Sequence, residues 1–304
     1  MRRCIVTGSS GFLGRHLINH LAKRSDLQVV GVDILPPVAT GTEHHQVDLL
    51  DRSATRAVFK GADMVCHLAA MGDVVAAEKN PERTLERNVA ATLNVSREAA
   101  DANAYLIYAS TWEVYGQSAT ASEWGAVDES RYCLPTNYYA ATKLSGEHVI
   151  SATAAISELR YSILRLGTAY GRGMRPHTAI MSFLAAASTG KDIVIAGTGG
   201  QTRQFTHIGD ICRAFELACD HQPRRALLNI AARRSVSISE VAGVICGHFG
   251  VNAVSSAGRH GDPPNAVVDV QAAKVALGWE AAMDFEFGLR ELIAEHAVTD
   301  SSRP

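Results

Sequence analysis

The chain has 304 residues, 47% of them apolar and 20% charged, so it is long enough to bury a sizeable core and should fold throughout. Its 29 Lys and Arg residues are balanced by 31 Asp and Glu residues and are dispersed, which argues against nucleic acid as a partner. Neither a signal peptide nor an apolar stretch of about 18 residues is visible, so we expect a cytoplasmic protein that makes no membrane contact.

The six cysteines show no CxxC or Cys/His spacing, so neither a zinc site nor any other metal site is expected. Cys4 and Cys66 lie inside apolar, strand-like runs, which predicts buried and reduced thiols. Cys133 precedes a helix and is expected to be an ordinary loop residue, with a place in a substrate pocket as the alternative.

The chain begins with an apolar run at residues 4–7, a glycine-rich turn, a helical pattern over 12–23 and a second apolar run at 29–32. Such alternation of strands and helices predicts an α/β fold, a Rossmann-type doubly wound parallel sheet. Later strands are expected at 64–68, 106–109 and 162–166, separated by helices such as 83–102 and 138–154.

The pattern changes after Gly171 to mixed loops, helices and short strands such as 193–195. We therefore expect a Rossmann domain at 1–167 and a smaller mixed α/β, substrate-binding lobe at 168–304. The two should be interleaved, because segments within about 205–231 (205–218 and 227–231) are expected to return to the sheet. Ser237 and Glu240 predict a capping box for a helix through Phe249, and 289–296 a closing helix.

The glycine turn has the composition of a phosphate-binding loop. Gly8, Gly11 and Gly14 allow a tight turn, a close approach of the backbone to a pyrophosphate, and close packing of helix on strand. The amides at the start of the helix then favour an anion. The spacing GxxGxxG differs from the more usual GxGxxG, and a plain strand-to-helix turn is the alternative.

An acidic residue at the end of the second strand selects the dinucleotide. Asp33 can accept hydrogen bonds from a ribose 2′-OH and would repel a 2′-phosphate, so NAD is expected rather than NADP, although Arg15 is a candidate for binding that phosphate. Asp48 and Leu49 should follow the third strand near the adenine, with a solvated loop as the equally good alternative for Asp48.

Tyr139 and Lys143 lie four residues apart in a helical segment, so their side chains should share one helix face. A phenol beside an ammonium is suited to proton transfer. Alone this spacing is common; together with the glycine turn it indicates an enzyme that moves a hydride.

Taken together, these motifs resemble those of the extended short-chain dehydrogenase/reductase family, specifically its NAD-dependent nucleotide-sugar epimerases and dehydratases. The resemblance extends over nearly the whole chain. It rests on TGSSGFLG at 7–14, HLAA at 67–70, Asn88, STWEVYG at 110–116, YYAATK at 138–143, LRLGTAYGRG at 164–173 and RQFTHIGD at 203–210.

The resemblance implies that Tyr139, as phenolate, takes the proton of the sugar C4 hydroxyl while NAD oxidises that carbon. Lys143 would favour the phenolate and bind the nicotinamide ribose. Thr111 would hydrogen-bond the same oxygen, with Ser110 beside it. The remaining cofactor contacts implied by the family's motifs are Phe12, Leu13, Leu68, Ala69, Ala70 and Asn88.

Glu113 bears on the branch of the family. Dehydratases and uronate decarboxylases of this family carry Glu there, whereas simple 4-epimerases usually have a small or neutral residue. A carboxylate could remove the C5 proton of a 4-keto sugar; the alternative is a solvated or Arg-paired side chain at the pocket rim. Trp112 stands where one type of hexose 4,6-dehydratase has an acidic Asp, which argues against that type and leaves Trp112 as a substrate contact.

Arg203 and Arg259 match positions where relatives hold the nucleotide diphosphate, and Arg175 belongs to the same expected wall, since a guanidinium binds phosphate oxygens in a bidentate way. Thr168 replaces the Asn that contacts the substrate in relatives, so the usual sugar preference does not transfer. A further set could reach the pocket but is expected to be structural: His177, His207 and His260.

The favoured function is therefore a UDP- or dTDP-sugar 4-epimerase. A sugar dehydratase or UDP-glucuronate decarboxylase that uses Glu113 as its base is the alternative within the enzyme class. A non-catalytic dinucleotide-binding sensor is the alternative outside it, and an NADPH-dependent reductase is opposed by Asp33. The family also implies a homodimer packed through the helices at 83–102 and 138–154.

Overall fold

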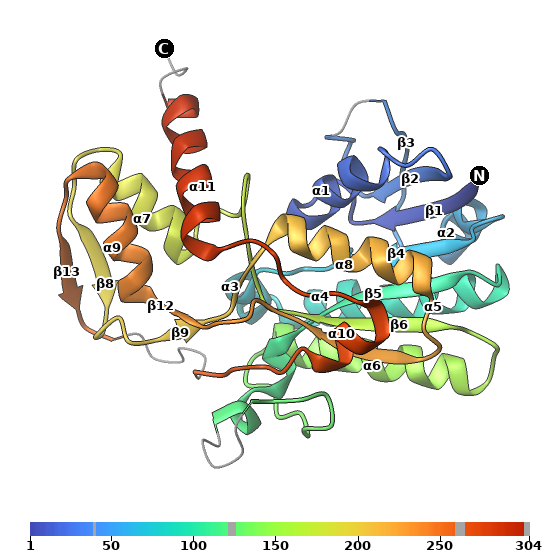
Figure 1. The fold of residues 1–304 in the computed structure, drawn as a ribbon. Coiled ribbons are helices and arrows are strands. Elements are labelled where there is room, and N and C mark those ends of the chain that lie inside the picture. Colours follow the sequence, from blue (N-terminus) through green and yellow to red (C-terminus); the bar gives the residue numbers. More distant parts are fainter. Residues whose placement is uncertain (39–40, 121–125, 259–264, 301–304) are drawn as a thin grey trace.

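A computed structural model describes residues 1–38, 41–120, 126–258 and 265–300. Its centre is a parallel sheet of seven strands with helices on both faces (Figure 1). The strands are β1 (Arg2–Thr7), β2 (Leu27–Asp33), β3 (Glu43–Gln46), β4 (Met64–His67), β5 (Tyr105–Thr111), β6 (Tyr161–Leu166) and β11 (Ala226–Ile230). Their order, β11-β6-β5-β4-β1-β2-β3, confirms the predicted α/β Rossmann-type fold.

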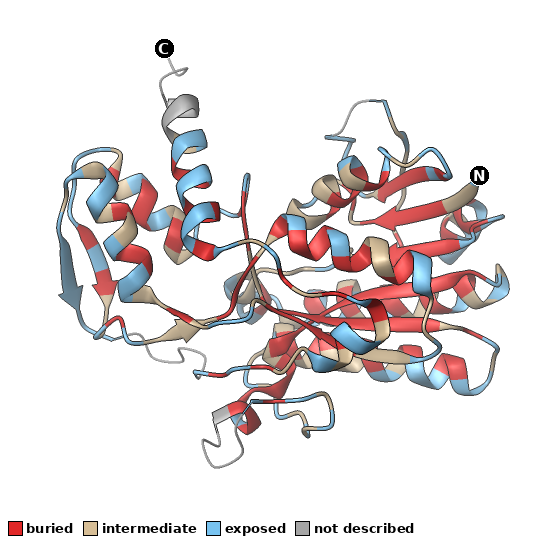
Figure 2. Cartoon of the chain, viewed as in Figure 1, coloured by how far each residue is buried: buried red, intermediate tan, exposed pale blue. Residues whose placement is uncertain are grey.

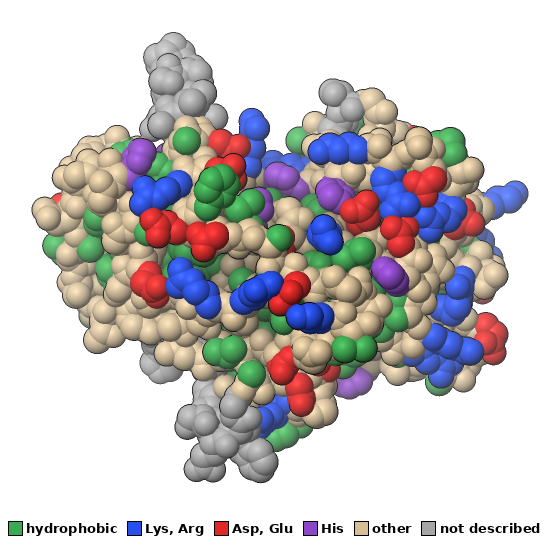
Figure 3. Space-filling view, viewed as in Figure 1, with side chains coloured by type: hydrophobic (Ala, Val, Ile, Leu, Met, Phe, Trp, Pro, Cys, Tyr) green, Lys and Arg blue, Asp and Glu red, His purple; other side chains and the backbone are tan. Residues whose placement is uncertain are grey.

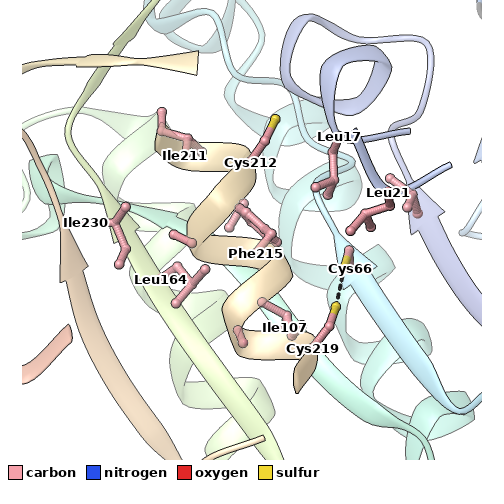
Figure 4. Close-up of a cluster of buried hydrophobic side chains, with 14 of the residues drawn as sticks. Leu17, Leu21, Cys66, Ile107, Leu164, Ile211, Cys212, Phe215, Cys219 and Ile230 are labelled. Atoms are coloured by element: carbon pink, nitrogen blue, oxygen red, sulfur yellow. Dashed lines mark hydrogen bonds between the residues drawn. The ribbon is translucent and has the colours of Figure 1, made fainter. Parts of the chain in front are cut away.

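Helices cover both faces of the sheet, which is why β4, β5 and β6 are buried along their whole length (Figure 2). One core lies between the sheet and three helices: α1 (Phe12–Leu21), α8 (Ile208–His221) and α10 (Gln271–Leu277). Part of it is drawn in Figure 4. The other core lies beneath α2 (Arg52–Phe59), α5 (Ala91–Asp101) and α6 (Tyr138–Ala155).

The helix predicted at 83–102 is not a uniform α-helix. It begins as α4 (Pro81–Leu85), passes through a π-helical turn, η1 (Glu86–Ala90), and continues as α5. The residue at the centre of that turn is Asn88. Such a turn inserts one extra residue into the helix, so a hydrophobic pattern with a period of 3.6 residues does not predict it. Turns of this kind often occur at functional sites.

A smaller body has a core of its own (Figure 1). It is built from α7 (Ala179–Ala187), β8 (Ile193–Ala196), α9 (Ile238–Phe249), β13 (Ala253–Ser256) and α11 (Phe285–Asp300). The capping box of Ser237 and Glu240 at the start of α9 is confirmed. The division at residues 167 and 168 stays a prediction.

Of the segments expected to return to the sheet, β11 pairs with β6 and α8 packs against the sheet, whereas residues 205–207 pair elsewhere. That segment, β10 (Phe205–His207), pairs with β7 (Thr168–Tyr170) in a separate two-stranded sheet. The short strands β9 (Thr202–Arg203) and β12 (Val236–Ser237) also pair with each other. The linking elements are α3 (Val74–Lys79) and the 3₁₀ turns η2 (Trp112–Tyr115) and η3 (Gln117–Thr120).

Charges of both signs are interspersed on the face shown in Figure 3. Within the described ranges, the helices are all too short or too polar to cross a membrane. The expected cytoplasmic location stays a prediction.

Candidate active site

The predicted phosphate-binding turn connects β1 to α1. Gly8 has φ +70°, and a Cβ there would lie 2.7 Å from the backbone N of Ala69. A Cβ on Gly14 would collide with the carbonyl of Gly8. Gly11 is the N-cap of α1 and places no side chain over the first amides of the helix. These residues fit a dinucleotide, because the turn leaves α1 free to receive a pyrophosphate.

Asp33 lies at the end of β2, beside the glycine turn. Its two carboxylate oxygens accept hydrogen bonds from the backbone N of Ser10 at 2.9 Å and of Leu35 at 3.0 Å. These bonds fix the carboxylate at the place where a ribose hydroxyl donates in this fold. Arg15, the candidate for a 2′-phosphate, instead donates a hydrogen bond to the carbonyl of Gly173.

Asp48 and Leu49 follow β3 and are held by the protein. An oxygen of Asp48 lies 2.8 Å from Nη1 of Arg87 and accepts from the backbone N of Leu50. Leu49 is buried in the core beneath α2 and α5. Asp48 is therefore paired with an arginine while its side chain stays 41% exposed, and the contact of either residue with adenine stays a prediction.

The loop that follows β4 carries Leu68, Ala69 and Ala70 and lies against the glycine turn through Ala69. Asn88, at the π-helical turn, holds this loop from the other side. Its Oδ1 accepts from the backbone N of Met71 at 2.7 Å, and its Nδ2 donates to the carbonyl of Met71 at 3.2 Å. Asn88 thus positions the loop, and its own contact with the cofactor stays a prediction.

A buried series of hydrogen-bonded polar side chains, which we call the polar chain, was not predicted from the sequence. Thr7 lies 2.7 Å from Nδ1 of His67, and Nε2 of His67 lies 3.0 Å from the hydroxyl of Thr92. Thr92 donates to the carbonyl of Asn88, whose amide donates to Thr142 on α6. Burial lowers the pKa of His67 to about 3, so its ring stays neutral and rigidly connects the sheet to α6.

The predicted catalytic residues meet at the carboxyl edge of the sheet. Tyr139 lies in the first turn of α6, and its hydroxyl is close enough to Thr111, at the end of β5, for that residue to lower the pKa of the phenol. Asn137 caps the helix by accepting from the backbone N of Ala140 at 2.8 Å. Lys143 is 2% exposed, and its Nζ lies 4.3 Å from the centre of the Tyr108 ring.

Burial dominates the ionisation of this pair. It raises the pKa of Tyr139, and the charge of Glu113 raises it further, while Arg175 and Thr111 lower it. Burial also lowers the pKa of Lys143 to about 7, against the attraction of Glu147. In the protein alone the groups that favour the phenolate are thus Arg175 and Thr111, and the predicted help from Lys143 is not among them.

Ser110 does not join Thr111 at the phenol. Its hydroxyl donates to Glu147 on α6, which also forms a buried, bidentate ion pair with Arg165 on β6, at 3.0 and 2.7 Å. Cys133 lies beside Arg165, and burial raises the pKa of its thiol. Sequence spacing gave no signal for this ion pair, because its members come together only in the fold.

Glu113 lies in the turn η2, directly after Thr111. Its Oε2 accepts a hydrogen bond from Nδ2 of Asn137 at 3.1 Å. Burial raises the pKa of Glu113, while Asn137, Arg203 and Arg175 oppose that rise. Glu113 therefore faces the site and is held by the residue that caps the helix of Tyr139.

The arginines gather beside these carboxylates and aromatic rings. Arg175 lies 3.6 Å from a carboxylate oxygen of Asp73 and is close enough to shift the pKa values of Tyr139 and Glu113. The guanidinium of Arg203 lies 5.9 Å from the ring centre of Trp112. Arg175 thus lies beside Tyr139 and Glu113, and its place in the expected diphosphate wall stays a prediction.

The remaining predicted residues have other contacts or lie outside the described part of the chain. Thr168, half-buried on β7, donates its backbone N to Gln204. His177 is exposed, and His207 caps α8 by accepting from the backbone N of Gly209. Arg259 and His260 lie outside the described residues.

A glycine turn, an acidic residue after the second strand and a Thr/Tyr/Lys set at the carboxyl edge define a dinucleotide-dependent enzyme. The model of the NAD-dependent epimerase/dehydratase family matches residues 4–231. The chain belongs to that family, and NAD is its cofactor.

Solved structures and curated relatives agree with this membership. MoeE5, solved with UDP-glucuronic acid and NAD, is 32% identical with a TM-score of 0.89, over 98% of this chain and 99% of that one. A putative UDP-glucose 4-epimerase of Methanocaldococcus jannaschii is 26% identical over 95% of this chain and 96% of its own length. A UDP-N-acetyl-alpha-D-glucosaminuronate decarboxylase of Bacillus cytotoxicus is 29% identical over 79% and 78%, respectively.

Proposed function

We propose that this enzyme is a 4-epimerase of a nucleotide sugar, most directly a UDP-linked hexuronate. The observation that carries the proposal is the placement of Tyr139 beside Thr111 and one helical turn from Lys143 on α6. A base and its hydrogen-bonding partner are what oxidation of a sugar hydroxyl needs from the protein.

Bound NAD supplies the site that accepts a hydride from C4 and gives it back. Tyr139 removes the proton of the C4 hydroxyl and returns it after the 4-keto sugar has presented its opposite face. Thr111 holds the reacting oxygen in line with the phenol. Lys143, one helical turn away on α6, would favour the phenolate when it is protonated.

The charges near the sugar end support a hexuronate. Arg175 lies beside both Tyr139 and Glu113, where a guanidinium can pair with a carboxylate at C5 of the sugar. MoeE5 has been solved with UDP-glucuronic acid and also with UDP-glucose. A dTDP-linked sugar remains the alternative for the nucleotide.

Decarboxylation or dehydration is the second candidate, and Glu113 favours it. Its carboxyl is buried beside Tyr139 and its pKa is raised by that burial, as suits a group that exchanges a proton near C5. The decarboxylase of Bacillus cytotoxicus also lies among the relatives. In an epimerase, Glu113 would instead orient Asn137 and the first turn of α6.

Product analysis decides between these activities. Purified enzyme is followed by nuclear magnetic resonance with UDP-glucuronate, UDP-glucose or UDP-N-acetylglucosamine. We expect inversion at C4 with the carboxylate retained, and Glu113→Gln should keep that activity within about tenfold because the hydrogen bond to Asn137 survives. Loss of the carboxylate or of water, abolished by Glu113→Gln, would establish the lyase instead.

We also propose that the enzyme is a homodimer packed through α5 and α6. These helices lie side by side on one face of the sheet, so a second copy can pack against both at once. Light scattering coupled to size-exclusion chromatography should give twice the mass of the 32.5 kDa chain.

A further inference from the structure

Three cysteines that are distant in sequence meet in the core between the sheet and α8. Cys4 comes from β1, Cys66 from the neighbouring strand β4, and Cys219 from the last turn of α8. The Sγ atoms of Cys4 and Cys66 lie 4.0 Å apart, those of Cys66 and Cys219 lie 3.9 Å apart, and all three lie within 4.8 Å of one another. Figure 4 shows Cys66 and Cys219 facing each other across the gap between strand and helix.

We propose that this cysteine trio binds one soft, three-coordinate metal ion of the Cu(I) class. Two sides of the sulfur triangle are about 4 Å and the third is at most 4.8 Å, so its centre lies about 2.3–2.5 Å from each corner, close to the length of a typical metal–thiolate bond. An ion at that centre would therefore bind all three sulfurs with little movement of the backbone.

The donor set selects the ion. Soft thiolates favour Cu(I), and the trio, as far as the described residues show, brings no imidazole or carboxylate with it. Structural zinc almost always takes four ligands in a tetrahedron, and three sulfurs in an apolar core do not complete one. A trigonal site buried among apolar side chains therefore suits Cu(I) better than Zn²⁺.

Metal binding releases protons from the three thiols. As each S–Cu bond forms, its thiol releases one proton to solvent, so three thiols and one Cu⁺ give a site with a net charge of −2. The guanidinium of Arg2, whose Nη1 donates to the carbonyl of Cys219, would offset part of the charge of the metal-bound trio.

The three cysteines are fully buried, but on one side the side chain of Arg2 separates them from solvent. Arg2 covers them, since its Nη1 donates to the carbonyl of Cys219 and lies 4.0 Å from the sulfur of Met64. The Arg2 side chain is 37% exposed, and Cys219 is close to the end of α8. Fraying of that last turn and displacement of Arg2 would open a path, so metal uptake should be slow.

The experiment titrates the purified, NAD-containing protein with Cu(I) without oxygen, against a coloured Cu(I) chelator. We expect one Cu(I) per chain, and X-ray absorption of that sample should give three sulfur neighbours at about 2.3 Å. No transfer of Cu(I) from the chelator, or a shell of two sulfurs or of nitrogen and oxygen, would overturn the proposal.

Cysteine variants test which thiols bind the ion. Cys66→Ala, checked for its fold by circular dichroism, should lower the affinity by about 100-fold or more, because a ligand is lost. Cys212→Ala is the matched control: Cys212 is buried on the same helix but lies beside Leu17, away from the trio (Figure 4), and its removal should leave binding unchanged. Retention of Cu(I) by Cys66→Ala, or its loss from Cys212→Ala, would contradict the assignment. If Cys66→Ala fails to fold, the number of sulfur neighbours that X-ray absorption finds around Cu(I) in the unaltered protein still tests the proposal.

Discussion

Polar groups at the cofactor edge of the site are buried and hydrogen-bonded within the protein, whereas the substrate edge sets a buried carboxyl beside a partly exposed guanidinium. The cofactor edge consists of the glycine turn and the polar chain, in which the ring of His67 has partners on both nitrogens. The substrate edge consists of Glu113, Arg175 and Arg203, and the side chain of Arg175 is 51% exposed. A cofactor that stays bound is suited by a rigid site whose polar groups are already hydrogen-bonded. A substrate that must bind and leave is suited by partly exposed charged side chains.

The largest effect should come from the residue at which the two edges meet. Tyr139→Phe removes the proton acceptor but keeps the ring, so the rate of C4 inversion should fall by about 10³-fold while bound NAD is retained. Tyr138→Phe is the control, because Tyr138 is exposed at the neighbouring position. An active Tyr139→Phe enzyme would remove Tyr139 from the chemistry.

A change in the glycine turn should act on the cofactor edge alone. The Cβ of Gly14→Ala meets the carbonyl of Gly8, and relief of that overlap should cost about 1–3 kcal/mol and expel most of the NAD. Gly243→Ala in α9 has open space around its Cβ and should leave cofactor content unchanged. The absorbance of NAD released on denaturation measures both variants. Full occupancy in Gly14→Ala would mean that the turn is more pliable than its contacts indicate.

The same contrast explains what could be predicted from sequence. Gly8, Gly14 and Asp33 act through local backbone geometry, so their spacing is enough to predict both the fold and the cofactor. The ion pair of Glu147 with Arg165 joins a helix to a strand, and no local period encodes it. The polar chain and the cysteine trio were missed for the same reason, since their members are adjacent only across the folded sheet.

His67 makes the cofactor edge sensitive to acid. The unfolded chain binds a proton at this ring near its ordinary pKa of 6.5, whereas burial keeps the native ring neutral until the pH approaches about 3. Stability should thus be lost as the pH falls through that window, by about 2 kcal/mol between pH 7 and pH 5. Urea unfolding at the two pH values should show this loss in the wild type and a smaller loss in His67→Gln. His177→Gln, altered at an exposed site, should behave as the wild type; equal pH dependence in all three proteins would remove His67 as the cause.

The smallest effect is expected at the substrate edge, from Arg175→Gln. The change removes a positive charge that lowers the pKa values of Tyr139 and Glu113, and it removes the proposed partner of a sugar carboxylate. KM for UDP-glucuronate should rise about 3- to 10-fold, while KM for uncharged UDP-glucose changes little, since a partly exposed ion pair contributes only about 1 kcal/mol. Arg172→Gln is the control, because Arg172 is more exposed and lies toward Glu295 on α11. If KM rises equally for both substrates in Arg175→Gln, the guanidinium binds the nucleotide diphosphate that the two substrates share. Arg175 would then belong to the diphosphate-binding wall expected from the sequence.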